Sequence, residues 1–156
     1  MSRTDIDETD RRILVALLKD ARRPYQEIAR ELHVSTATVH GRFQRLKEMG
    51  IVSGSKLSVN FEKLGLEVVA FIGVNLASAK DFNNVIENLR MFPEVVDVHY
   101  TTGGYSMFIK VIVRTIKELH LFIATKLQGI SQIQSTETLI SLDNPIRREP
   151  DVPSGQ

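Results

Sequence analysis

Two short helical segments with a tight break between them constrain the fold of this chain more than any other feature. In the first segment, residues 25–32, the apolar side chains share one helical face: Ile28, Ala29 and Leu32. In the second segment, residues 35–47, they again repeat at helical spacing: Val39, Phe43 and Leu46. Only His33 and Val34 separate the two. Two short helices joined by so tight a turn predict a helix-turn-helix.

The outer face of the second segment carries hydroxyl, imidazole and guanidinium groups. Phosphate oxygens and base edges accept hydrogen bonds from such groups. We therefore expect this face to lie in the major groove of double-stranded DNA, or against its flanking phosphates, through Ser35, Thr36, Thr38, His40, Arg42 and Arg45. Three further cations are expected mainly to fix the position of the chain on the DNA backbone: Arg22, Lys47 and Lys56.

Three neighbouring features favour DNA binding over a polar face that is merely solvated. Ser35 is a good N-cap, which fixes where the second helix begins. Gly50, followed by apolar Ile51, is typical of a helix end with a left-handed residue. Residues 22–56 contain seven basic and three acidic side chains, and an excess of positive charge suits a polyanionic partner.

The first sixty residues are expected to form three helices and a wing. The first helix is predicted over residues 8–20, capped by Asp7 and with Asp10 in its first turn. Its buried stripe is predicted to be Ile13, Leu14, Leu17 and Leu18. Residues 51–59 roughly alternate in polarity, which predicts a short β-ribbon that bends near residues 53–55.

The rest of the chain alternates between strand-like and helix-like segments. Strands are predicted over residues 67–76, 95–102, 105–114 and 133–142, and helices over residues 81–91 and 115–127. The order βαββαβ is that of a ferredoxin-like split sheet, so the predicted fold class is α+β. One face of such a sheet lacks helices, and a homodimer formed sheet to sheet would cover the apolar side chains expected there: Phe71, Val74, Phe108 or Ile112.

The length of 156 residues allows two small domains. We place a winged helix-turn-helix domain at residues 1–60, a linker at 61–66, the βαββαβ domain at 67–146 and a loose tail at 147–156. The first sixty residues hold 11 basic and 8 acidic side chains, and the others hold 9 and 11. That asymmetry has the sign expected of a DNA-binding head on a near-neutral body.

Cysteine content and apolar runs indicate the compartment. The chain has no cysteine, which excludes disulfides and thiolate metal sites and fits a reducing environment. The first residues are polar and acidic, unlike a signal peptide, and the longest apolar run, residues 68–74, is too short to span a bilayer. We expect a cytoplasmic protein, associated with the nucleoid, that does not bind membranes.

An enzyme is the weaker hypothesis. The four histidines are scattered without the spacing of metal ligands: His33, His40, His99 and His120. No serine occupies a nucleophile elbow, and no glycine pattern of a phosphate-binding loop is present. We expect no catalytic residue, no metal site and no cofactor.

Six stretches of the chain carry motifs of a known family: residues 6–14, 21–29, 34–40, 50–54, 100–106 and 135–142. On these stretches, which span nearly the whole length, the chain resembles the Lrp/AsnC family of bacterial feast/famine regulators. Ser106 and residues 132–138 are most similar to its asparagine-responsive branch. The resemblance implies a winged helix-turn-helix joined to an amino-acid-sensing βαββαβ domain, with dimers assembling into an octamer. It also implies control of an asparagine synthetase gene and of the regulator's own promoter.

The resemblance further implies an effector site between dimers, near the hairpin turn after the second strand. L-asparagine is the implied effector, and the implied ligand-binding residues are Tyr100, Thr101, Thr102, Gly103, Gly104, Tyr105, Ser106, Gln128 and Gln134. Glycines let backbone N–H groups approach a carboxylate, and Thr and Gln side chains can pair with an amide. Many relatives carry an acidic residue where this chain has Ser106, so the group that binds the ligand ammonium stays open.

Two alternatives remain at this point. Apart from the resemblance, Gly103 and Gly104 would form an ordinary hairpin turn. The competing function is an architectural protein that wraps DNA with little sequence preference and ignores metabolites. An effect of L-asparagine on melting temperature or DNA mobility would separate the sensor from the architectural protein.

Overall fold

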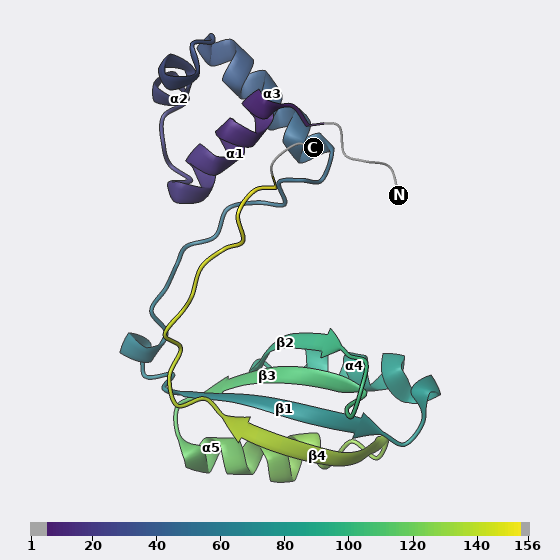
Figure 1. Cartoon of the computed structure of the whole chain (residues 1–156). Helices are drawn as coiled ribbons and strands as arrows, with labels where there is room; N and C mark the ends of the chain where they lie inside the picture. Colours follow the sequence, from purple (N-terminus) through teal and green to yellow (C-terminus); the bar gives the residue numbers. More distant parts are fainter. Residues whose placement is uncertain (1–5, 154–156) are drawn as a thin grey trace. The chain divides into compact units, whose positions relative to one another are not determined.

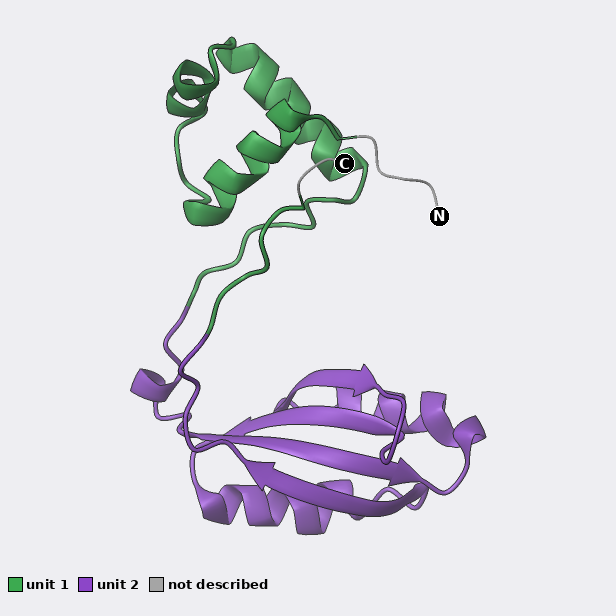
Figure 2. Cartoon of the chain, viewed as in Figure 1, with its two compact units in different colours: residues 1–58, 147–156 green, residues 59–146 purple. Residues whose placement is uncertain are grey.

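The computed structural model describes residues 6–153 and divides the chain into two compact units. Figure 2 shows a helical unit of residues 1–58 with 147–156 and a sheet unit of residues 59–146. Within residues 6–153, no helix is both long enough and apolar enough to cross a membrane.

Three helices form the helical unit: α1 (Glu8–Lys19), α2 (Tyr25–Leu32) and α3 (Thr36–Glu48) (Figure 1). Asp7 and Asp10 form a capping box at the start of α1, so the predicted cap is confirmed. Between α2 and α3, His33 adopts a left-handed conformation with φ of 56°. This tight reversal lets two short helices pack against each other, as the helix-turn-helix pattern predicts.

The end of α3 is confirmed in detail. Gly50 has a φ of 72°, and its N–H donates to the carbonyl of Lys47 at 2.9 Å. The N–H of Ile51 donates to the carbonyl of Leu46 at 3.0 Å. These two bonds form a Schellman motif, which satisfies carbonyls that the helix itself leaves unpaired.

The core of the helical unit is small and differs from the predicted stripe of α1, since it includes Ala16 and does not include Leu14 or Leu18. Its buried side chains are Ile13, Ala16, Ile28, Ala29, Val39 and Leu46. The inclusion of Leu18 in this core was wrong, since Leu18 is 57% exposed. The buried stripe of α1 follows steps of three and four residues, from Asp10 to Ile13 and on to Ala16 and Leu17, and Leu18 lies about 100° further round the helix.

The predicted wing is wrong as well. Residues 51–60 contain neither helix nor strand, so the β-ribbon over residues 51–59 is absent. A hairpin with arms this short is barely stable alone, and no strand of the described part of the subunit pairs with it.

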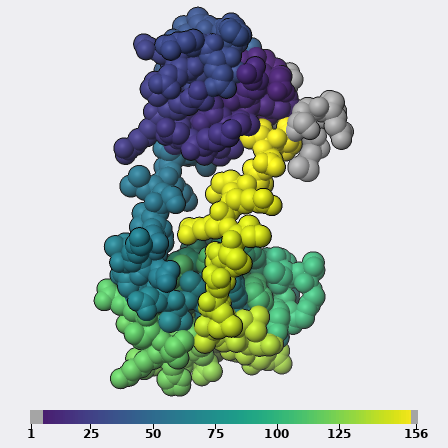
Figure 3. All heavy atoms as spheres, turned by 60° about the vertical axis from the view of Figure 1, so that its left-hand side comes forward, coloured from purple at the N-terminus to yellow at the C-terminus, as the bar shows by residue number. Residues whose placement is uncertain are grey.

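The C-terminal segment, predicted to be a loose tail, contains neither helix nor strand over residues 147–153. Residues 147–153 cluster with the helical unit, and Figure 3 shows yellow C-terminal atoms beside the purple N-terminal part of that unit. The side chain of Arg11 donates from Nε to the carbonyl oxygen of Pro153 at 3.0 Å. This hydrogen bond connects the segment to α1.

The sheet unit has the predicted βαββαβ order. Its elements are β1 (Val68–Leu76), α4 (Phe82–Arg90), β2 (Val95–Tyr100), β3 (Met107–Val113), α5 (Ile116–Leu121) and β4 (Ile133–Ile140). Two short 3-10 helices, η1 (Glu62–Leu64) and η2 (Ala79–Asp81), are added, and a π-helical segment, η3 (Phe122–Leu127), continues α5. The strands pair antiparallel in the order β2-β3-β1-β4, so the fold class α+β is confirmed.

One face of this sheet is covered by helices and the other is open. The covered face contributes Ala70, Ile72, Val74, Met107, Ile109 and Val111 to the main core. Alternate residues of the same strands form the open face: Val69, Phe71, Phe108, Lys110, Ile112, Glu137 and Leu139. The placement of Val74 on the open face was wrong, because side chains alternate with period two and Phe71 and Val74 are three residues apart.

Candidate functional site

The first turn of α3 presents a fixed group of hydroxyls. Ser35 is the N-cap, as predicted, and its Oγ accepts from the Thr38 N–H at 3.0 Å. The same Oγ lies 2.8 Å from Thr38 Oγ1. Thr36 is exposed in the same turn. The cap therefore fixes the direction of the Ser35 and Thr38 hydroxyls, and each retains hydrogen-bonding capacity for another partner.

Aromatic rings hold two other predicted DNA-binding side chains of α3. The exposed His40 ring lies 6.0 Å from the ring of Tyr25, edge to face, and Tyr25 also packs against Phe43 at 5.7 Å. Burial raises the pKa of the Tyr25 hydroxyl. Lys47 Nζ lies 5.2 Å from the centre of the Phe43 ring, a cation–π contact. These contacts restrict where His40 and Lys47 can reach.

Arg42 differs from its neighbours because its guanidinium bonds to carboxylates of the same subunit. Its Nη1 donates to Asp7 Oδ2 at 2.5 Å and to Asp10 Oδ1 at 3.0 Å, and its side chain is 29% exposed. The Asp7 hydrogen bond is the main reason that the pKa of Arg42 is raised. The same bond is the main reason that the pKa of Asp7 is lowered. A DNA contact by Arg42 stays a prediction, and here its guanidinium is bound to the first turn of α1.

Sequence reasoning did not include Asp10 among the residues of this surface. The Asp10 side chain is only 1% exposed, accepts the Asp7 N–H at 3.1 Å, and has Oδ2 at 3.6 Å from Arg45 Nη1. The sequence does contain a signal for this cluster. Asp10 lies three residues before Ile13 on the buried stripe, and a buried carboxylate requires a hydrogen-bonded or charged partner.

The other predicted DNA-binding cations lie at the surface. Arg45 is on α3 with a half-exposed side chain, Arg22 lies in the turn before α2, and Lys56 lies in the extended segment after α3. Their contacts with DNA remain predictions. The predicted residues on α3 are Thr36, Thr38, His40, Arg45 and Lys47, with Ser35 as its N-cap, and Lys56 does not lie on a wing.

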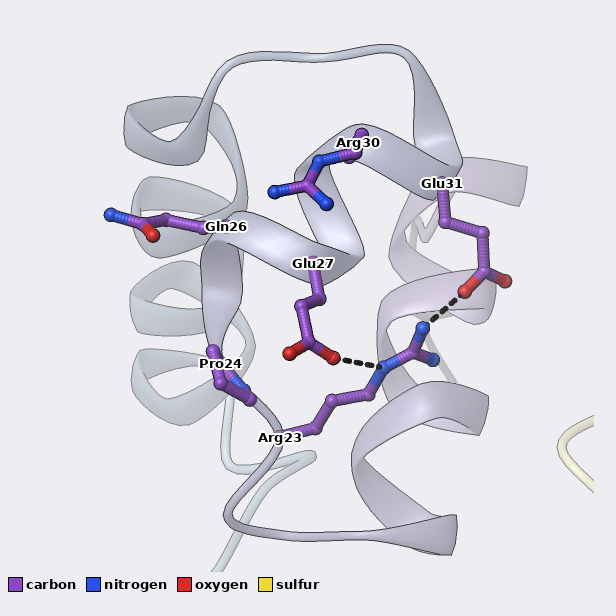
Figure 4. Close-up of a pocket in the computed structure, with 6 residues that line it drawn as sticks. All are labelled: Arg23, Pro24, Gln26, Glu27, Arg30 and Glu31. Carbon is purple, nitrogen blue, oxygen red and sulfur yellow. Dashed lines mark hydrogen bonds and ion pairs between the residues drawn. The ribbon is translucent and has the colours of Figure 1, made fainter.

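A second surface feature of the helical unit is a hollow of about 520 Å³ beside α2 (Figure 4). It is lined by Arg23, Pro24, Gln26, Glu27, Arg30 and Glu31. Arg23 lies between two carboxylates, with Nη2 at 2.5 Å from Glu31 and Nε at 3.8 Å from Glu27, and the bond to Arg23 lowers the pKa of Glu31. Because the two arginines and two glutamates balance, the hollow has no net charge with which to attract phosphates.

The predicted ligand-binding hairpin is a short, closed loop between β2 and β3. The Thr101 N–H donates to the Ser106 carbonyl at 3.2 Å, and Thr101 Oγ1 donates to the Tyr105 carbonyl at 2.9 Å. Gly103 has a φ of 109°, which favours glycine. Thr102, Gly103 and Gly104 are exposed at the tip. The loop therefore presents backbone groups to solvent on a rigid base.

Tyr105 turns from the hairpin across the open face of the sheet. A Cβ at Gly73 would lie 2.7 Å from ring atoms Cδ1 and Cγ of Tyr105, so the ring rests directly on the glycine. The Tyr105 hydroxyl donates to Glu137 on β4, and this bond is the main reason that the pKa of Tyr105 is raised. Tyr105 also packs near Phe108, with ring centres 5.8 Å apart. One residue thus connects the hairpin to the open face.

Two predicted ligand residues lie close to the end of β1. Ser106 donates from its N–H to the Val74 carbonyl at 2.9 Å, and its Oγ accepts the Leu76 N–H at 3.2 Å. On the other side of β1, the register shift between Asn75 and Leu76 leaves Gln134 as an extra, exposed residue of β4. Gln128 is exposed at the end of η3. The sheet therefore brings Ser106 and Gln134 to the same end of β1.

The far end of β2 completes this surface. The Tyr100 side chain is 68% exposed, yet its ring contacts Phe82 of α4 edge to face, at 4.7 Å between centres. Across residues 6–153, no group of three or more His, Cys, Asp or Glu side chains is arranged to hold a metal ion. The chemistry available here is hydrogen bonding by hydroxyls, amides and backbone groups.

Comparison with known proteins covers both units. Residues 6–47 match the AsnC-type helix-turn-helix domain, and residues 69–151 match the Lrp/AsnC ligand binding domain. The chain is 51% identical over 145 residues to the regulatory protein AsnC of Haemophilus influenzae, which covers 93% of this chain and 97% of that protein. It is 46% identical over 143 residues to the regulatory protein AsnC of Escherichia coli, covering 92% and 94%.

The fold agrees with a solved structure of E. coli AsnC. The TM-score is 0.92 with 44% sequence identity, over 95% of this chain and 99% of that one. The helix-turn-helix and the βαββαβ sheet described above are the two domains that the family matches identify. The chain therefore belongs to the Lrp/AsnC family and is a DNA-binding transcriptional regulator with an amino-acid ligand-binding domain.

Proposed function

We propose that this regulator senses L-asparagine and controls an asparagine synthetase gene together with its own gene. The observation that supports this most is the hairpin of residues 101–106, on the domain that matches the family's ligand-binding region. L-asparagine has a carboxylate, an ammonium and a side-chain amide, which need donors and acceptors close together. Exposed backbone N–H groups at Gly103 and Gly104 suit the carboxylate.

The side-chain amide of the ligand requires a partner that both donates and accepts. Gln134 and Thr102 are exposed and can do both. The hydroxyl of Ser106 accepts from the Leu76 N–H and can still donate its own proton. A neutral serine there suits an uncharged amide, whereas the ammonium must find its acceptor elsewhere, among carbonyl oxygens or on another subunit.

The proposal includes assembly of subunits. The hairpin, Gln128 and Gln134 form an open surface in one subunit, and a ligand-binding site buries most of a small ligand. A second copy that covers this surface would complete the site, first as a dimer through the open sheet face and then as an octamer. L-asparagine would shift assembly only by its difference in affinity between the two arrangements.

Calorimetric titration of the full chain with each of the twenty common amino acids tests the ligand. We expect heat of binding with L-asparagine, weaker binding of L-aspartate, and a change in sedimentation with L-asparagine present. The Gln134→Ala variant should lose most of this binding, while the control Lys117→Ala, on the first turn of α5 beyond the other end of β3, should retain it.

A second experiment tests the target genes. Footprinting on the promoters of an asparagine synthetase gene and of the regulator's own gene should show protected sites that change with L-asparagine. DNA binding without sequence preference, combined with no response to any amino acid, would instead favour the architectural protein. Binding to specific promoters with another amino acid as effector would reject only the choice of ligand.

A further inference from the structure

The strongest unassigned feature is the ion-pair cluster between the start of α1 and the middle of α3. Arg42 bonds to both Asp7 and Asp10, and Arg45 lies 3.6 Å from the same buried Asp10. Asp7 and Asp10 also bond to each other's backbone N–H, at 2.9 Å and 3.1 Å. The cluster joins the helix that carries the DNA-binding side chains to a helix outside the helix-turn-helix pair.

Burial decides what Arg42 can do. The Asp10 side chain is 1% exposed, and removing the partner of a buried ion leaves a charge that water does not solvate. If DNA drew Arg42 away, Asp10 would keep the Asp7 N–H bond and the contact with Arg45 at 3.6 Å, but it would lose the guanidinium that lies closest to it. A buried charge left in this way costs more than one base or phosphate contact returns. This difference in free energy favours an Arg42 that keeps its carboxylate partners when DNA binds.

We propose that Arg42 is a positioning residue, which acts through Asp10 and Asp7 to fix α3 against α1 and does not itself contact DNA. The exposed donors of the same helix then contact the duplex: the hydroxyls of its first turn, His40 and Arg45. The raised pKa of Arg42 and the lowered pKa of Asp7 are consistent with this strong mutual pairing.

The salt dependence of DNA affinity separates the two roles. A cation that neutralises a phosphate contributes about 0.9 to the slope of log affinity against log salt. A positioning residue contributes nothing to that slope, because the number of phosphates contacted is unchanged. It instead lowers affinity at every salt concentration and lowers the stability of the helical unit.

The test compares three variants of the full chain, Arg42→Gln, Asp10→Asn/Arg42→Gln and the control Arg114→Gln, an exposed arginine of the sheet unit. Each is titrated with a mixed-sequence duplex over a salt series, and its thermal unfolding is recorded. Arg42→Gln leaves Asp10 short of a partner, so we expect a lower unfolding temperature, affinity reduced tenfold or more, and an unchanged salt slope. Arg114→Gln should match the parent chain in all three.

The double variant decides the matter if Arg42→Gln alone unfolds. The amide introduced by Asp10→Asn can still accept the Asp7 N–H and can pair with the amide introduced by Arg42→Gln, without any buried charge. We therefore expect unfolding temperature and DNA affinity to recover together in the absence of a guanidinium at position 42. Recovery of stability without recovery of affinity would overturn the proposal, as would no recovery of either. A loss of about one from the salt slope in Arg42→Gln, with stability intact, would also overturn it.

Discussion

In the helical unit, the polar side chains nearest the core have partners within the subunit, whereas in the sheet unit a whole face of apolar side chains remains open. Asp10 is buried and bonded to Arg42, and the capping groups of α1 and α3 are satisfied. Phe71, Phe108 and Leu139 instead lie on a face without helices. The helical unit thus satisfies its own buried polar groups, while the sheet unit leaves apolar side chains uncovered within one subunit.

The two units also differ in how their functional groups are fixed. On α3, contacts within the unit set the direction of each side chain, such as Tyr25 against His40. On the sheet, the hairpin connects through Tyr105 to Glu137, which lies on the open face itself. A partner on that face would therefore contact the same residues that hold the hairpin.

The largest expected effect tests whether the helical unit has its own core. Ile13→Ala removes a fully buried side chain and should destabilise this unit by about 2–5 kcal/mol. Urea unfolding followed by amide exchange should show the loss confined to helices α1 to α3. Val15→Ala, on the exposed side of the same helix, is the matched control and should change little. Equal destabilisation of the sheet unit would show that the two units unfold as one.

The next effect tests the contact of Tyr105 with Gly73. A side chain at position 73 would collide with the Tyr105 ring, so Gly73→Val should displace it, break its bond to Glu137, and cost about 1–3 kcal/mol. Urea denaturation of the sheet unit measures the cost. Gly104→Ala is the control, since a Cβ there meets nothing within 4 Å. An unchanged unfolding midpoint in Gly73→Val would contradict the packing described here.

A third effect tests whether the open face associates with a second copy. Phe71→Asp places a charge on that face, where the Phe71 ring now lies 6.4 Å from Phe108. Dimer association should weaken by at least about tenfold, equivalent to about 1.4 kcal/mol, as measured by sedimentation equilibrium. Leu142→Asp, at a position that is 98% exposed, should leave association unchanged. Full association of Phe71→Asp would place the dimer contact on another surface.

The smallest effect is a pH dependence of the helical unit. Asp7 accepts a hydrogen bond from Arg42, and this bond lowers the pKa of Asp7 below the ordinary carboxyl value. The stabilisation is therefore complete above the unfolded pKa and is lost as the pH falls through the lowered, folded pKa. Urea midpoints of the parent chain and of Asp7→Asn, taken across the acid range, should converge at low pH. The difference should be modest because the Asp7 side chain is half exposed.

Local patterns predicted the elements of both units well. Ser35 and Gly50 mark the ends of α3 through backbone bonds that depend on neighbouring residues only, and the six elements of the sheet unit fall where apolar periodicity places them. The wing failed because a ribbon needs a pairing strand, which local alternation does not reveal. The placement of Val74 on the open face was wrong because Phe71 and Val74 are three residues apart, and an odd spacing puts two strand residues on opposite faces. The sequence alone could have shown this.

The candidate site was harder to predict, since it depends on contacts between distant positions. Arg42 and Asp10 are 32 residues apart, and only packing of α1 on α3 shows that this arginine is engaged. Tyr105 and Glu137 are also 32 residues apart. Residue type and position along the helix or hairpin predicted which side chains could bind DNA or a ligand. They did not show which of these side chains already had a partner within the subunit.

The seat of the Tyr105 ring on a glycine has a consequence for engineering this regulator. Random replacement of position 73 alone should return glycine from any selection for function, because every other residue needs the space that the tyrosine fills. Libraries that vary positions 73 and 105 together should contain functional pairs of residues that are absent from libraries of either position alone. Substitutions at position 73 therefore have to be combined with substitutions at position 105.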